Sequence, residues 1–435
     1  MLTGLNNVNN VIFRGITPLK QSKACVSNSY VQSPLVKNVS FHGYNTVDVA
    51  KTQLTTPSEL KAYTEVASSL DSEGKKALDY MLKTGSLLNN NSDDKSTTLD
   101  NLHKILLNDR ASGLDKKGIL NDTVKTIANP YGITQHFGNI PESMIGTLKQ
   151  YDNSTEEVEH SGCCVAASIE FNLASQMPAE FARIAEGLSS PNMSVKKHLS
   201  LNTLCDNKED SKWLLDNFKI PYTMTDENNV EVTIAPDKNA IFRAHIQTVD
   251  KDELERTPVD VLMQSTLMNI GSQQTYNTLN DTRVASFGPG DKGLVEIEKT
   301  FTESVVTNSN KTSVTFQDLR EGVDKSGAPS AKLAGYRTDF NTIKRCLLNS
   351  LAEGKNVIIG YTSTDEDNNI VNGHEITVVG AKLTPDNKLI FVCNDTDDDK
   401  AAPVEYHEDY IIPKIHHVGL PTEIVEADPR LENIA

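Results

Sequence analysis

The sequence predicts an α+β protein, in which helices dominate the first half and strands gather toward the end. Apolar residues recur at helical spacing between about 56 and 145. A run of small and apolar helix-forming residues follows Cys164, and three strand-like segments lie at 356–361, 375–379 and 388–393. Helices and strands are therefore segregated along the chain, which favours α+β over an alternating α/β fold.

Three parts are expected along the chain. Residues 1–55 are rich in Asn, Ser, Thr and Val and lack periodicity, which predicts a mobile N-terminal tail. Residues 56–145 predict a helical accessory domain whose first helix is capped by Ser58. A helical segment upstream of an enzyme can instead be an inhibitory pro-region, so both interpretations stay open. Residues 146–435 predict a mixed domain of helices and strands.

The elements of the mixed domain follow from periodicity and turn residues. The expected elements before its last three strands are helices after Cys164 and over 213–218, 257–279 and 340–351, and strands over 295–307 and 312–316. Gly354 is expected to end the last of these helices. Pro385-Asp386-Asn387 is predicted to form the turn that joins the final two strands as a hairpin.

Composition limits the class of partner. The chain has 435 residues, of which 37% are hydrophobic and 23% charged, so it can bury a core. Its net charge of −17 repels nucleic acid and anionic membrane, so neither is an expected partner. No apolar run reaches the roughly 18 residues that a membrane span needs. Residues 1–23 lack the apolar core of a secretory signal, which predicts a cytoplasmic protein or export without a cleavable hydrophobic signal.

The cysteines indicate reduced thiols rather than a disulfide framework. Six cysteines are scattered over a long chain, and none of them has CxxC or Cys/His metal spacing. The adjacent pair His416-His417 likewise has no partner ligands at metal spacing and is predicted to be structural. Neither a metal nor a cofactor is therefore expected.

One cysteine stands where a nucleophile is typical. Gly162 and Cys163 lead into Cys164, and the small residues that follow place this thiol at the start of a helix. At a helix N-terminus the macrodipole and the unpaired N–H groups stabilise a thiolate, which lowers a thiol pKa from about 8.5. The same N–H groups can bind an oxyanion. The plain alternative is a pair of cysteines that only pack.

A histidine and an acidic or amide residue fall on the predicted C-terminal hairpin. His374 precedes the first strand of the hairpin, and Asn394 and Asp395 end the second. Because the start of one antiparallel strand lies beside the end of its partner, we expect His374 to neighbour Asn394 or Asp395. With Cys164, these residues supply a nucleophile, a base and an orienting group.

At these residues the sequence resembles the papain family. The run from Gly162 to Ser168 is similar to the Gly-Ser-Cys-Trp-Ala-Phe-Ser that begins the papain central helix. The segments 354–359 and 373–395 resemble the bacterial peptidases of the same clan that process bacteriocin leaders. The resemblance implies a papain-like fold, in which a central helix packs on an antiparallel sheet, and a cysteine peptidase that acts on a peptide or protein through an acyl-enzyme.

The same resemblance assigns the roles of the site residues. It makes Cys164 the nucleophile, His374 the base and Asp395 the orienting residue, whereas papain itself uses Asn, which would favour Asn394. The separation of Cys164 from His374 exceeds two hundred residues, which is long for the clan and implies a large insertion around 206–335.

The sequence departs from the family pattern at the expected oxyanion side chain. The clan carries a Gln shortly before the nucleophile, but Val158 stands there and the nearest upstream Gln is Gln150. Val165 replaces the Trp after the nucleophile. Glu375 follows the histidine, where it would raise the pKa of His374 or face solvent.

Two other functions fit the same residues. A transglutaminase-like or deamidating enzyme uses the same order of Cys, His and Asp, and Met177-Pro178-Ala179 faintly resembles a motif that follows the nucleophile helix of such enzymes. A non-catalytic papain-like binding protein would explain the missing oxyanion Gln. Thiol labelling separates the enzymes from the binding protein.

Overall fold

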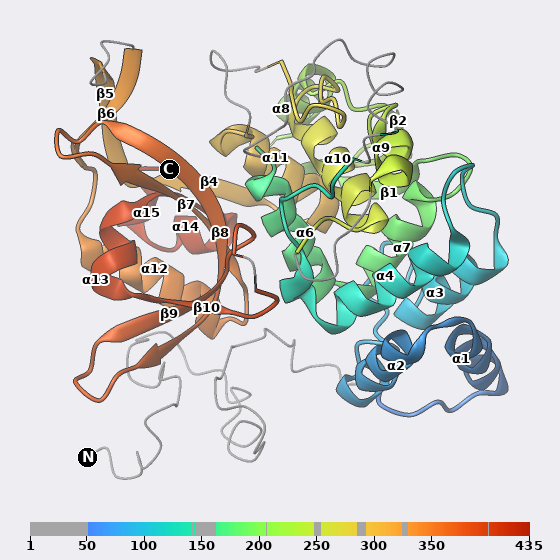
Figure 1. Cartoon of the computed structure of the whole chain (residues 1–435). Helices are drawn as coiled ribbons and strands as arrows, with labels where there is room; N and C mark the ends of the chain where they lie inside the picture. The colour runs from blue at the N-terminus through green and yellow to red at the C-terminus, as the bar shows by residue number, and fades with distance from the viewer. Residues whose placement is uncertain are drawn as a thin grey trace. The chain divides into compact units, whose positions relative to one another are not determined.

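The computed structural model describes residues 51–140, 143, 162–205, 207–247, 254–284, 293–323, 329–398 and 400–435. The part described is a mixture of helices and antiparallel sheets, which confirms the α+β class (Figure 1). The predicted tail over 1–50 lies outside it. The described residues form two compact units, which we call the helical unit (Ala50–Lys311 and Thr396–Ala402) and the sheet unit (Thr312–Asp395 and Pro403–Ala435).

The helical unit begins with the predicted helical segment. Its helices are α1 (Pro57–Ser69), α2 (Ser72–Thr84), α3 (Thr98–Leu107) and α4 (Lys116–Ala128), followed by the short η1 (Pro130–Gly132). The N-cap of α1 is Thr56 rather than the predicted Ser58. Thr56 Oγ1 accepts from the backbone N–H of Glu59, and the Glu59 carboxylate accepts from the backbone N–H of Thr56, so the two residues form a capping box.

The predicted domain boundary at 145/146 is not a boundary between the two units. Helices α3 and α4 pack against α7 (Pro178–Leu188) and α10 (Pro258–Gly271) and so share one core with them. Asn101 Nδ2 donates to the carbonyl of Ala179 at 3.2 Å, and Arg110 forms an ion pair with Glu186 at 2.9 Å. These polar contacts tie α3 and the loop after it to α7.

Helix α6 (Cys164–Gln176) is a buried helix of the helical unit. Every residue from Val165 to Ala174 is buried, so α6 has no solvent face. Its packing partners within the unit include α4, α7, α10 and α11 (Glu296–Thr307). The other elements of the unit are β1 (Val195–Ser200), η2 (Leu201–Thr203), α8 (Lys208–Asn217), β2 (Tyr222–Met224), β3 (Asn229–Ile234) and α9 (Ala240–Ile246), and the strands pair antiparallel in the order β1-β3-β2.

Two sequence predictions in this unit are corrected. The segment 295–307 was expected as a strand but forms α11. Glu298 stabilises the start of this helix by accepting a hydrogen bond from the N–H of Val295 at 2.8 Å. Phe301 and Val305, four residues apart, then lie on one buried face of the helix. The helix expected over 257–279 is shorter, since α10 ends at Gly271. Gly271 packs against Leu294 so closely that a Cβ would lie 2.7 Å from the leucine side chain.

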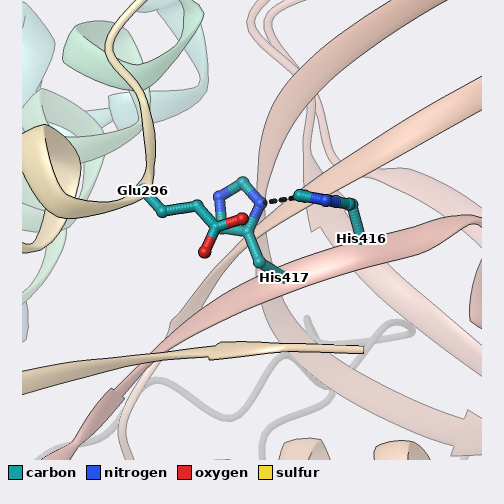
Figure 2. Close-up of side chains that lie close together, drawn as sticks. All are labelled: Glu296, His416 and His417. Carbon is teal, nitrogen blue, oxygen red and sulfur yellow. Dashed lines mark hydrogen bonds between the residues drawn. The ribbon is translucent and has the colours of Figure 1, made fainter. Parts of the chain in front are cut away.

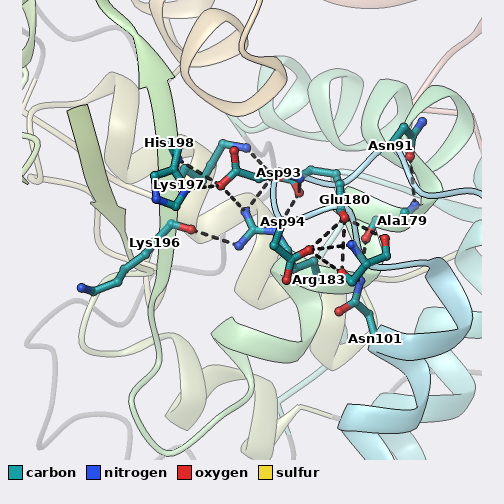
Figure 3. A network of polar contacts seen from close by, with 12 residues as sticks. Asn91, Asp93, Asp94, Asn101, Ala179, Glu180, Arg183, Lys196, Lys197 and His198 are labelled. Carbon is teal, nitrogen blue, oxygen red and sulfur yellow. Dashed lines mark hydrogen bonds and ion pairs between the residues drawn. The ribbon is translucent and has the colours of Figure 1, made fainter. Parts of the chain in front are cut away.

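A buried ion-pair network joins the loop before α3, α7 and β1 (Figure 3). Glu180 on α7 pairs with Lys197 on β1 and accepts from Arg183 Nε at 2.8 Å. It also accepts from the backbone N–H of Asp93 at 3.0 Å. Burial alone would raise the pKa of Glu180, but the Arg183 hydrogen bond and the Lys197 charge lower it to about 2. The carboxylate therefore stays ionised inside the core.

The sheet unit holds a six-stranded antiparallel sheet, drawn in orange to red in Figure 1. Its strand order is β10 (Val404–His407), β9 (Leu389–Asn394), β8 (Ile370–Leu383), β7 (Val357–Thr364), β11 (Ile415–Pro421) and β4 (Lys311–Thr315). Helix α12 (Phe340–Ala352) packs on β7 and β8 over an apolar core that includes Ile359, Ile376 and Phe391. The remaining elements are the pair β5 (Gln317–Val323) and β6 (Pro329–Tyr336), with α13 (Glu408–Ile411), η3 (Ile412–Lys414), α14 (Thr422–Glu426) and α15 (Pro429–Glu432).

The predicted C-terminal hairpin is confirmed. β8 and β9 pair antiparallel, with Thr377 opposite Asn394, and the chain turns between them at 384–388. Gly354 follows Glu353, the C-cap of α12, and has φ +77°, as expected of a helix-ending glycine. Among the helices of the described residues, none is long and apolar enough to cross a membrane.

Candidate functional site

Cys164 is the first residue of α6, as the sequence predicted. Its side chain is only partly buried, in contrast to the fully buried helix that follows. The preceding Cys163 occupies the N-cap position, but its side chain makes no capping hydrogen bond to the helix. Cys164 therefore stands at a helix N-terminus whose first N–H groups are not capped by the side chain of Cys163.

Cys163 is chemically different from its neighbour. Its Sγ is fully buried, 2.9 Å from Oδ1 of Asp281 and 3.2 Å from the hydroxyl of Tyr276. Burial raises the pKa of the Cys163 thiol to about 12, and the nearby Asp281 carboxylate contributes in the same direction. A buried thiol with so high a pKa is a poor nucleophile near neutral pH, which favours Cys164 of the two.

The structure brings His374 and Asp395 together. Nε2 of His374 lies 2.7 Å from Oδ1 of Asp395, and both side chains are nearly buried. Oδ2 of Asp395 accepts a hydrogen bond from the hydroxyl of Tyr406, also at 2.7 Å. The ring of His374 is set edge to face with Tyr361 on the adjacent strand. The imidazole is thus held by a carboxylate that is itself held by a phenol.

Of the two candidate orienting residues, Asp395 makes the contact. Asn394 is the last residue of β9 and pairs with Thr377, whereas Asp395 follows the strand and turns toward His374. The hairpin register explains the contact: Asn394 is opposite Thr377, so Asp395 lies just beyond the paired residues, on the side of His374. The predicted contact of His374 with Asn394 or Asp395 is confirmed, and the catalytic role of the pair stays a prediction.

Glu375 has a partner that the sequence did not predict. Because successive side chains of a strand point to opposite faces, Glu375 points away from the face of His374. It is 6% exposed, and its carboxylate lies 2.9 Å from Nε2 of His417 on β11. The two meet across Gly360 of the intervening strand β7, where a Cβ would collide with both. Glu375 therefore does not face solvent.

His416 and His417 are adjacent on β11, and Figure 2 shows their imidazole rings edge to face. Their Nδ1 atoms are 2.9 Å apart, so one ring donates and the other accepts. The sequence predicted a structural role for the pair because it has no partner ligands at metal spacing, and in the structure His417 contacts the buried carboxylate of Glu375. The one sequence signal that Glu375 and His417 come close together was Gly360, a glycine inside the apolar strand β7.

The predicted triad is distributed over the two units. Cys164 belongs to the helical unit, and His374 and Asp395 belong to the sheet unit. Gln150 and Val158, considered for the oxyanion side chain, lie outside the described residues.

A cavity of about 520 Å³ lies elsewhere in the helical unit. Its lining includes Asp93, Glu180 and Lys197 of the ion-pair network, and Met177 at the C-terminal end of α6. Cys164 is at the opposite end of this helix, so the cavity is separate from the thiol.

We compared the chain with protein-family models, curated proteins and solved structures, and no match was found.

Proposed function

We propose that the protein is a thiol hydrolase, a cysteine peptidase of the papain-like clan, with Cys164 as nucleophile, His374 as base and Asp395 as orienting group. The observation that carries the proposal is the contact between His374 Nε2 and Asp395 Oδ1 at 2.7 Å. The partly exposed thiol at the start of α6 supports it, because a thiol at a helix N-terminus is placed for nucleophilic attack.

The chemistry follows from which ring nitrogen is engaged. Since Nε2 of His374 is hydrogen-bonded to Asp395, Nδ1 is the atom that takes the thiol proton. The Cys164 thiolate attacks a carbonyl carbon of a peptide, and the imidazolium returns its proton to the leaving amine. Water, deprotonated by the same imidazole, then hydrolyses the acyl-thioester and restores the thiol. Asp395 keeps its charge throughout and stabilises the imidazolium.

A peptide that carries a thiol-reactive electrophile tests this assignment. We expect covalent labelling of Cys164 in the native chain, loss of labelling in Cys164→Ala, and labelling slowed at least about a hundredfold in His374→Ala. Cys205→Ala is the matched thiol control, because Cys205 is also a partly exposed cysteine of the helical unit. His103→Ala is the matched imidazole control, because His103 also pairs with a carboxylate, Glu65.

Contrary results would separate the other functions. Labelling that is absent from the folded native chain, or equal in wild type and His374→Ala, would contradict the proposal. If labelling occurs as expected, mass spectrometry of incubated peptides distinguishes two cleavage products from the small mass increase of deamidation. Deamidation without cleavage would replace the peptidase by a deamidating enzyme on the same residues.

A further inference from the structure

Asp281 lies at the end of a short closed loop beside the start of α6. The backbone groups of Asn277 and Thr282 bond to each other in both directions, at 2.8 and 3.3 Å, and close the loop. Asp281 is 1% exposed and has φ +51°, a left-handed conformation that is unfavourable for most residues. A buried charged residue in such a conformation persists only where its surroundings hold it.

The carboxylate of Asp281 binds the two residues that precede Cys164. Its Oδ2 accepts from the backbone N–H of Gly162 at 2.8 Å. Its Oδ1 accepts from the thiol of Cys163 at 2.9 Å and from the hydroxyl of Tyr276 at 2.5 Å. One side chain therefore receives three donors, two of which come from the segment that leads into α6.

The charge of this carboxylate is matched within the unit. Arg256 is fully buried and interacts electrostatically with Asp281, Tyr276 and Cys163. Its guanidinium also stacks on the ring of Phe137, 3.8 Å from the ring centroid. An acceptor-only group with an opposing cation suits this place, whereas an amide would turn its NH₂ toward one of the three donors.

The contacts also decide what the N-cap side chain does. The thiol of Cys163 points to Asp281 and so makes no capping bond to α6. The side chain that most often satisfies the first N–H groups of a helix is thereby turned away from them. The contacts of Gly162 and Cys163 with Asp281 fix the chain directly before the thiol of Cys164.

We infer that Asp281 is a positioning residue for the nucleophile: it holds Gly162 and Cys163 so that Cys164, at the start of α6, faces the reacting group. This inference rests on the proposed function, since it assigns Cys164 the role of nucleophile. In this interpretation Cys163 is not a second nucleophile, and its thiol serves to bind Asp281.

Alkylation by iodoacetamide, mapped by mass spectrometry at Cys164 from about pH 5 to 9, tests the inference without a known substrate. The variants are Asp281→Asn, Cys163→Ala and Cys163→Ser, with Glu180→Gln as control. Glu180→Gln disturbs another buried carboxylate of the same unit, whose hydrogen-bond partners among the described residues are Arg183, Lys197 and the backbone of Asp93. Circular dichroism establishes that each variant is folded.

We expect Asp281→Asn and Cys163→Ala to slow alkylation at Cys164 at least about tenfold and to move its pH profile toward alkaline pH. Cys163→Ser keeps a donor for Asp281 and should restore most of the rate. Glu180→Gln should react as the wild type does, although it is less stable. If Asp281→Asn does not fold, two other measurements test the inference. One is the comparison of the alkylation rates of Cys163→Ser and Cys163→Ala. The other is Tyr276→Phe, in which we expect a smaller decrease in the alkylation rate.

Two results would overturn the inference: a folded Asp281→Asn with the wild-type rate and pH profile, or equal rates in Cys163→Ser and Cys163→Ala. Failure of the proposed function looks different. In that case His374→Ala keeps the wild-type pH profile, while Asp281→Asn and Cys163→Ala still change it.

Discussion

Glu180 is the centre of the buried network in Figure 3, and its replacement by Gln tests how strongly that network stabilises the helical unit. The side chains of Glu180 and Lys197 are 1% and 2% exposed. Arg183 donates to the same carboxylate from Nε and Nη2, at 2.8 and 2.9 Å. Gln keeps the shape of Glu180 but removes the charge that these two cations face.

The magnitude follows from the pKa of Glu180. A pKa lowered from 4.5 to about 2 corresponds to about 3 kcal/mol in favour of the ionised carboxylate, since one pKa unit is worth about 1.4 kcal/mol. The neutral amide also leaves Lys197 buried without its partner, and removing one partner of a buried pair typically costs about 3–5 kcal/mol. We expect Glu180→Gln to lower the free energy of unfolding by about 3–4 kcal/mol.

Urea denaturation followed by circular dichroism measures this loss. Lys197→Met is the matched control, because Glu180 then keeps Arg183, and we expect it to lose only about 1–2 kcal/mol. The double variant removes the orphaned ammonium and should regain at least about 1 kcal/mol over Glu180→Gln. A Glu180→Gln chain within about 0.5 kcal/mol of wild type would refute the reasoning.

The stability difference between wild type and Glu180→Gln should depend on pH. Because the pKa of Glu180 is lower in the folded chain than in the unfolded chain, its contribution is complete above about pH 4.5 and is lost as the pH falls toward about 2. The difference in unfolding free energy between wild type and Glu180→Gln should therefore shrink between about pH 5 and pH 3. A difference that stays constant over this range would contradict the assigned pKa.

Two further changes test the sheet unit. Gly360→Ala places a Cβ 2.7 Å from Nδ1 of His417 and closer still to Glu375, so it should force these two buried side chains apart and lower the free energy of unfolding by about 2–4 kcal/mol. A urea midpoint equal to that of wild type would refute the packing described. Tyr406→Phe removes the hydroxyl that donates a hydrogen bond to Asp395. It should lower the free energy of unfolding by about 1–2 kcal/mol and slow labelling by the peptide electrophile severalfold. An unchanged labelling rate would show that this hydroxyl does not support the site.

Local patterns carried the successful sequence predictions. The contact between His374 and Asp395 was predictable because both residues belong to one hairpin, whose register is set by a short turn. The thiol at the start of α6 was predictable from a few neighbouring residues. The same local reasoning failed over 295–307, where β-branched residues alternate as in a strand but are buried as a helix.

Contacts between segments that are far apart in the sequence could not be predicted from it. Asp281 meets Gly162 and Cys163 across more than a hundred residues, and no local pattern marks it as their partner. Glu375 and His417 meet only because β11 pairs with β7, which places them on either side of Gly360. The extent of the helical unit likewise depends on the packing of α3 and α4 against α7 and α10. Strand order and helix packing over such distances are set by the tertiary fold.

The central claim is that His374 acts as the base for the thiol of Cys164. The alkylation rate of Cys164 at about pH 5.5 tests this claim most directly, because an isolated thiol is almost entirely protonated and unreactive at that pH. The account predicts that the wild-type chain still reacts at this pH and that His374→Ala reacts at least about a hundred times more slowly. Cys205 should be alkylated at the same rate in both chains. Equal rates at Cys164 in the two folded chains would contradict it.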